Sequence, residues 1–190
     1  MKKIACLVVS VVLPLCVFAQ SSPSDAHMKA IWGHINARLN SQTDIWFKKG
    51  YFPTCINLLR YEYEEDPSNY DIATNLGWML ENVHLWDKAL AIYVRFRKDN
   101  PTMADAAFPE AYFYFEQKAY SKVPPLLQPT ISRHPFANSY RLLAHSYEKL
   151  GLYPDALTVW KQLVVDYPQD AAAKLNMEKI AKKVGGTNAG

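Results

Sequence analysis

Histidine is the residue type in this chain whose chemistry would most directly indicate an enzyme or a metal site. Imidazole groups act as general bases near neutral pH and as zinc ligands. No two histidines flank a glutamate in the HExxH spacing of zinc hydrolases. Each is therefore expected to be a surface or packing residue, and no metal site is predicted. The five are His27, His34, His84, His134 and His145.

Other catalytic patterns are also missing from the sequence. There is no Gly-x-Ser-x-Gly turn for a serine nucleophile, and the seven glycines form no phosphate-binding loop. Cys55 is the one cysteine outside the N-terminal segment, so no internal disulfide is expected. It could be reactive or link two chains, but a buried thiol packing as a small hydrophobe fits its position better. We predict a non-enzymatic protein that needs no cofactor.

Prolines divide the chain at a nearly constant interval. Pro67, Pro101, Pro135 and Pro168 are separated by 34, 34 and 33 residues. A period of 34 residues is typical of stacked helix–turn–helix repeats. The element that must position any functional residue is therefore predicted to be a repeated pair of helices.

Columns of equivalent residues support this period. Large apolar residues stand 8 and 21 positions before each proline, and small residues stand 12 and 24 positions before it. Large and small residues that face each other in register allow two helices to pack closely. The small columns are Cys55, Ala89, Val123, Ala156 and Thr43, Gly77, Ala111, Ala144; the large columns are Leu59, Tyr93, Leu127, Trp160 and Trp46, Leu80, Tyr114, Tyr147.

The repeat pattern resembles that of the tetratricopeptide repeat (TPR) family over about residues 36–168. Two units carry most of the likeness: Leu76-Gly77 with Ala89, Tyr93 and Pro101, and Tyr140 to Ala144 with Tyr147, Gly151, Ala156, Trp160 and Pro168. The unit ending at Pro67 matches only in its second half. The resemblance implies a right-handed α-solenoid, and it says little about function because such repeats serve many partners.

The expected architecture is all-α, with about four TPR-like hairpins between an N-terminal helix and a C-terminal capping helix. Gly50 and Gly151 are expected in turns, and Asp170 is expected to cap the last helix. Leu175 and Ile180 are expected to cover the final pair. The predicted helices are 27–40, 42–49 with 52–65, 70–83 with 86–98, 104–118 with 121–133, 137–150 with 153–166, and 170–183. The repeat domain thus spans 27–184, followed by a disordered tail, 185–190.

The third unit contains prolines that a regular hairpin would not tolerate. Pro124 and Pro125 fit the first turn of a helix, and Pro109 indicates a late helix start. Pro129 would remove a backbone hydrogen bond within the helix, at about 3 kcal/mol. We predict a kink or break there, which is either a bend that reshapes the binding surface or a tolerated irregularity.

In TPR proteins the first helix of each pair lines a concave groove that usually binds an extended peptide or a helix. The resemblance therefore implies a partner-binding groove, with Trp78, Tyr112 and His145 in one column as aromatic anchors. Phe108 and Phe115 could instead belong to the core. The groove lacks the lysines and second asparagine of a carboxylate clamp. The candidates by repeat register are Asp44, Phe47, Lys48, Thr74, Asn75, Trp78, Asn82, Phe108, Tyr112, Phe115, Arg141, His145 and Glu148.

The N-terminus has the features of a signal peptide. Lys2-Lys3 precede the apolar run from Ile4 to Phe18, and the small residues Val17 and Ala19 fit a cleavage site after Ala19. Lipidation at Cys16 is the alternative, although Leu15 is a poor preceding residue. We expect residues 1–19 to be a signal peptide, residues 20–26 a polar leader, and the protein to be periplasmic or secreted.

Charge and composition narrow the function further. The whole chain has 21 basic and 18 acidic residues; without Lys2 and Lys3 the balance is 19 to 18, or +1. This charge predicts neither nucleic-acid binding nor strong membrane association after cleavage. Three functions remain: a module that binds a protein or peptide in its groove, a structural subunit of an envelope complex, and an enzyme that stacks its substrate on aromatic rings. The missing acid–base pair disfavours the third.

Overall fold

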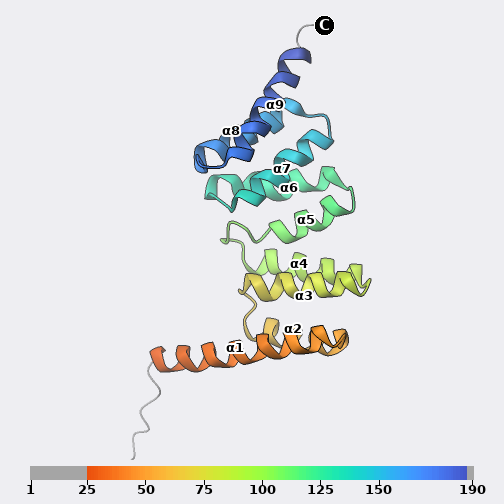
Figure 1. Ribbon diagram of the computed structural model, residues 1–190, viewed down its shortest axis with the longest axis vertical. Coiled ribbons are helices and arrows are strands. Elements are labelled where there is room, and N and C mark those ends of the chain that lie inside the picture. The colour runs from red at the N-terminus through yellow and green to blue at the C-terminus, as the bar shows by residue number, and fades with distance from the viewer. Residues whose placement is uncertain (1–24, 188–190) are drawn as a thin grey trace, which may run out of the picture. The chain divides into compact units, whose positions relative to one another are not determined.

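The computed structural model describes residues 25–187, over which the chain is helical and contains no β-strand. Residues 25–40 belong to one compact unit of the chain and residues 41–187 to another. The predicted signal peptide and residues 188–190 lie outside the described range. The α-helices are α1 (Asp25–Lys48), α2 (Phe52–Glu65), α3 (Tyr70–Asn82), α4 (Trp86–Asp99), α5 (Phe108–Glu116), α6 (Val123–Leu127), α7 (Ala137–Lys149), α8 (Tyr153–Asp166) and α9 (Ala171–Thr187) (Figure 1).

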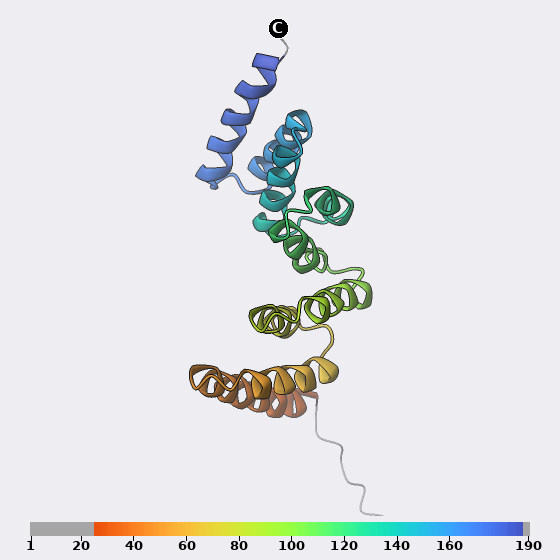
Figure 2. The same cartoon turned by 90° about the vertical axis from the view of Figure 1, so that its right-hand side faces the viewer.

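The predicted separation between helices 27–40 and 42–49 is wrong, because α1 is continuous over 24 residues. The Asn-Ser-Gln-Thr stretch at this point contains no proline or glycine, so nothing in the sequence ends the helix. Helix α1 also begins at Asp25, inside the segment predicted as a polar leader. The predicted hairpins 70–83 with 86–98 and 137–150 with 153–166 are observed as α3 with α4 and as α7 with α8, and the two helices of each pair pack against each other (Figure 2).

Both predictions about the third unit are confirmed. Helix α5 begins at Phe108 with Pro109 in its first turn. Helix α6 ends after Leu127, and the chain continues as a 3-10 helix over Gln128–Arg133. Pro129 has no N–H to continue the α-helical ladder, so the backbone changes to the tighter helix at that point.

The equivalent columns form the core between paired helices. Cys55, Ala89, Val123 and Ala156 are all fully buried. Gly77 shows why one of these positions must be small: a β-carbon there would lie 2.1 Å from a ring carbon of Tyr93. The turns behave as predicted too, since Gly50 and Gly151 both adopt φ of +75°, a conformation that favours glycine.

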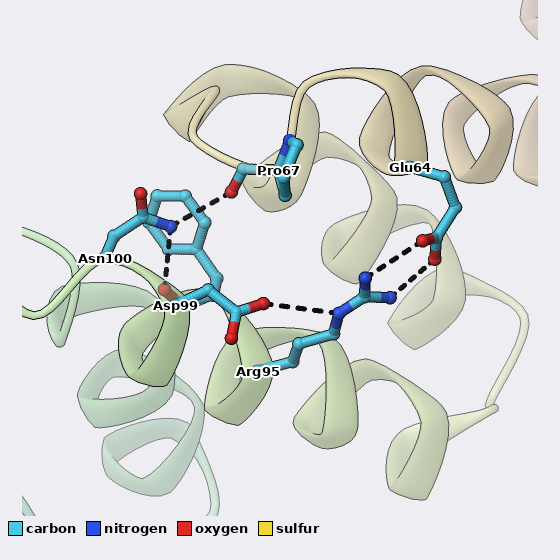
Figure 3. A network of polar contacts seen from close by, with 6 residues as sticks. Glu64, Pro67, Arg95, Asp99 and Asn100 are labelled. Carbon is cyan, nitrogen blue, oxygen red and sulfur yellow. Dashed lines mark hydrogen bonds and ion pairs between the residues drawn. The ribbon is translucent and has the colours of Figure 1, made fainter.

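Successive repeats are joined by hydrogen bonds to the carbonyl oxygens of the repeat prolines. The Asn100 amide donates to the Pro67 carbonyl at 3.0 Å (Figure 3). The Arg133 guanidinium donates to Pro101 at 2.6 Å, and the Tyr167 hydroxyl donates to Pro135 at 2.8 Å. The carbonyls of these three prolines thus each accept a hydrogen bond from a side chain 32 or 33 residues further along the chain.

Ion pairs add to the links between repeats. Arg95 of α4 donates to both carboxylate oxygens of Glu64 on α2, at 2.5 and 2.9 Å, and contacts Asp99 one turn away (Figure 3). This network is exposed to solvent, so its contribution to stability is small. The buried carboxylate of Asp105 makes a better protected link, accepting from the Phe136 amide at 3.0 Å and the Ser139 hydroxyl at 2.7 Å. Asp105 therefore caps the start of α7, whose own N-cap residue, Phe136, makes no side-chain capping hydrogen bond.

The C-terminal helix, α9, packs against α8 of the last hairpin through a different face from the one expected. Asp170 accepts from the Ala173 amide at 3.0 Å, as predicted for an N-cap. Ile180 is fully buried, but Leu175 is 68% exposed, so its predicted role is wrong. Five residues correspond to about 140° around a helix, so the two side chains cannot face the same neighbour. The helix continues to Thr187, so residues 185–187 of the predicted tail are helical.

Candidate interaction surface

Three large aromatic side chains on successive first helices are substantially exposed. Phe47 on α1 is 39% exposed, Trp78 on α3 is 50% exposed, and Tyr112 on α5 is 48% exposed. The Phe47 and Trp78 rings lie 5.8 Å apart, so the first two hairpins present an aromatic pair. We call these three residues the aromatic surface. They occupy positions at which the sequence predicted partner contacts.

Tyr112 is held by its neighbours in the irregular third unit. Its ring stacks on Phe108 at 5.9 Å with an interplanar angle of 22°. Phe108 and Phe115 are half-buried and pack against the hydrophobic core, and Phe115 also contacts Tyr120 at 5.1 Å. These two phenylalanines therefore support the surface from within the core, which is the alternative that the sequence left open.

The predicted groove residues of the fourth hairpin are engaged within the protein. The Arg141 guanidinium pairs with Asp170 and also donates to Asn138 at 2.8 Å. Glu148 accepts a hydrogen bond at 3.0 Å from the indole of the buried Trp160. His145 makes an edge contact with the Trp160 ring at 5.1 Å and lies 3.2 Å from Glu148. The sequence column does not reveal these contacts, because it aligns equivalent positions of the repeats and carries no information on their neighbours.

Polar candidates surround Trp78 on the first two hairpins. Asn75, Asn82 and Lys48 are exposed, as is Asp44. The Asn82 amide donates to the Trp78 carbonyl at 2.7 Å, whereas the Thr74 hydroxyl donates to the Tyr70 carbonyl at 2.9 Å within the helix. Asn75 is thus placed to offer hydrogen bonds beside an aromatic ring.

The carboxylates of Glu116 and Glu81 affect the pKa of Tyr112, the member of the aromatic surface on α5. Burial, reinforced by the neighbouring Glu116 and Glu81 carboxylates, raises the pKa of Tyr112. Burial also raises the pKa of Glu81, partly opposed by a 2.6 Å hydrogen bond from the Tyr93 hydroxyl. Tyr112 consequently remains a neutral hydrogen-bond donor throughout the physiological pH range.

Within residues 25–187, no three histidine, cysteine or acidic side chains are gathered as a metal site would require. The same part of the chain has no helix that is both long and apolar enough to cross a membrane. Cys55 is a free, buried thiol whose Sγ lies 3.6 Å from the Thr43 carbonyl oxygen, in keeping with the packing interpretation.

Solved structures of MamA, a TPR-like helical protein, are similar to this chain. Two crystal structures of MamA superpose with TM-scores of 0.60 and 0.59 at 19% and 20% identity. They cover 80% and 75% of this chain, and 84% of each MamA chain. A MamA structure from Desulfovibrio magneticus RS-1 gives a TM-score of 0.58 at 14% identity, covering 78% of this chain and 85% of that one.

No family model and no curated protein matches the sequence. At the identities above, the structural likeness shows the fold alone. The chain therefore has a TPR-type α-solenoid fold, as the proline period and the residue columns predicted.

Proposed function

We propose that this protein is a non-enzymatic interaction module that binds a peptide or a helix on its aromatic surface. One observation carries the proposal: Trp78 and Tyr112 stand at equivalent positions 34 residues apart, and each leaves about half of its surface exposed. Repeat proteins bind partners through side chains that recur at equivalent positions along one face. Tryptophan and tyrosine dominate the binding energy of many interfaces, because they bury a large rigid area and also carry a polar group.

The position of the polar groups supports a peptide as the partner. Asn75 and Asn82 flank Trp78 on its own helix, and Lys48 lies beside Phe47. Amide side chains can pair with the backbone of an extended peptide while the rings hold its apolar side chains. The near-neutral charge of the chain supports a protein or peptide partner and disfavours nucleic acid. We also propose export of the protein, on the basis of its signal-like N-terminus.

A structural subunit of an envelope complex is the second candidate. Trp86 at the start of α4 is 42% exposed, and Tyr61 on α2 is 55% exposed. Both belong to second helices, so a partner held by them would use a different set of helices from the aromatic surface. The two proposals therefore predict sensitivity to different aromatic residues.

Affinity capture from an envelope extract separates the two proposals. The baits are the full chain, a Trp78→Ala/Tyr112→Ala variant, and a Trp86→Ala/Tyr61→Ala variant that removes the same two residue types elsewhere. A partner lost only with Trp78 and Tyr112 would support the aromatic surface. A partner lost only with Trp86 and Tyr61 would support the structural role, and retention by both variants would contradict both proposals.

A further inference from the structure

The irregular third hairpin borders a cavity of about 280 Å³ that the proposed function does not use. Arg97 and Lys98 line it from the end of α4, and Met103 and Ala106 line it from the segment before α5. Pro129 and Arg133 complete it from the 3-10 helix. The cavity thus lies at the point where Pro129 ends helix α6.

Positive charge dominates the lining of this cavity. Three of its lining residues are cationic, and no acidic residue lines it among residues 25–187. Arg97 uses its Nε to bind Glu110 at 2.6 Å, which offsets one of the three charges. Arg133 donates one N–H to the neutral Pro101 carbonyl, so its charge is not offset by that bond. Lys98 is exposed and forms no ion pair with the rest of the described chain, which leaves a net charge of about +2 at the cavity.

Apart from Asn100 and Thr130, the other lining residues are apolar. Met103 and Ala106 provide hydrocarbon surface, and the ring of Pro129 adds more. An apolar hollow lined by a few polar groups is typical of small-molecule binding sites. A volume of 280 Å³ is that occupied by about nine molecules in liquid water. This space is suited to a compact organic molecule rather than to a helix.

We propose that this cavity binds a small organic anion, either a carboxylate or a phosphate ester. Lys98 and Arg133 hold its acidic group, and the apolar part lies against Met103 and Ala106. Guanidinium groups pair with two oxygens of a carboxylate or phosphate at once, and ammonium groups add a point charge. The proline-rich sequence of the third hairpin then has a role, because the break at Pro129 forms one wall of the site. This proposal is independent of the aromatic surface.

Titration of the full chain with benzoate, followed by amide NMR spectra, tests the proposal. Benzamide is the matched neutral probe, since it has nearly the same shape without the charge. At about 10 mM probe, benzoate should shift the signals of Lys98, Met103 and Ala106, and benzamide should not. Phenyl phosphate is the third probe: tighter binding than benzoate identifies a phosphate ester as the ligand class, and weaker binding identifies a carboxylate.

A Lys98→Gln/Arg133→Gln variant should bind benzoate at least about tenfold more weakly, because both charge-assisted hydrogen bonds are lost. Lys88→Gln/Lys161→Gln removes two exposed charges elsewhere and should leave binding unchanged. Lys98→Gln alone keeps the Arg133 bond to Pro101, so it tests the site even if the double variant unfolds. Equal shifts with benzoate and benzamide, shifts confined to other residues, or no shift with any probe would overturn the proposal.

Discussion

Replacement of Gly77 by alanine tests the close packing on which the repeat columns depend. A β-carbon at Gly77 would lie 2.1 and 2.2 Å from two ring carbons of Tyr93 and 2.5 Å from its hydroxyl oxygen. The ring is 5% exposed and its hydroxyl is bonded to Glu81 at 2.6 Å, so it has little room to move. We expect Gly77→Ala to destabilise the fold.

The magnitude follows from three contributions. Alanine is favoured over glycine within a helix by about 1 kcal/mol. Overpacking of a core costs about 1–3 kcal/mol, and losing the hydrogen bond from Tyr93 to the Glu81 carboxylate costs about 1.5–3 kcal/mol. The net expectation is a loss of about 1.5–5 kcal/mol in the free energy of unfolding. Urea denaturation followed by circular dichroism measures it.

Two comparisons make this reasoning refutable. Gly33 lies within α1, and a β-carbon there would meet nothing within 4 Å beyond its own helix among residues 25–187, so Gly33→Ala should not destabilise the protein. In a Tyr93→Leu background the clashing ring atoms are absent, and Gly77→Ala should become neutral or stabilising by up to about 1 kcal/mol. If Gly77→Ala has the same effect with Tyr93 and with leucine in its place, the steric explanation is wrong.

Three other predictions follow from single side chains. Ile180→Ala should lower the free energy of unfolding by about 2–5 kcal/mol, whereas Leu175→Ala should change it by less than about 0.5 kcal/mol; urea denaturation of both variants checks which face of α9 is covered. Asp105→Asn should cost about 1–3 kcal/mol and speed hydrogen exchange at the Phe136 amide, and unchanged exchange there would contradict the capping role. Burial raises the pKa of the Glu62 carboxyl above its usual 4.5. The contribution of this group to the free energy of unfolding is therefore fully present below pH 4.5 and is lost as pH rises through the raised pKa. The Glu62→Gln variant should be more stable than the unmodified protein at pH 7, and its unfolding free energy should depend less on pH between about 4 and 7.

The sequence predicted the interaction surface only in part. Register alone places Trp78, Tyr112 and His145 in one column. Trp78 and Tyr112 are indeed exposed, but His145 contacts the buried Trp160 and lies beside Glu148. The repeat register gives only the position of a residue along and around its helix. Which partners it meets depends on the residues that neighbouring helices bring to it.

The sequence by itself determined the fold class, the repeat period, the second and fourth helix pairs and the break at Pro129. These follow from local rules: spacing of large and small residues selects the helix faces that pack, and proline cannot continue an α-helix.

Only the tertiary structure decided how the repeats are joined and where the cavity lies. Asn100, Arg133 and Tyr167 all donate to a proline carbonyl of the preceding repeat, yet they are an amide, a guanidinium and a phenol. A role filled by a different residue type in each repeat leaves no pattern in the sequence. The cavity likewise gathers side chains from positions 97–133, and their proximity arises only when α4 and the 3-10 helix come together in the fold.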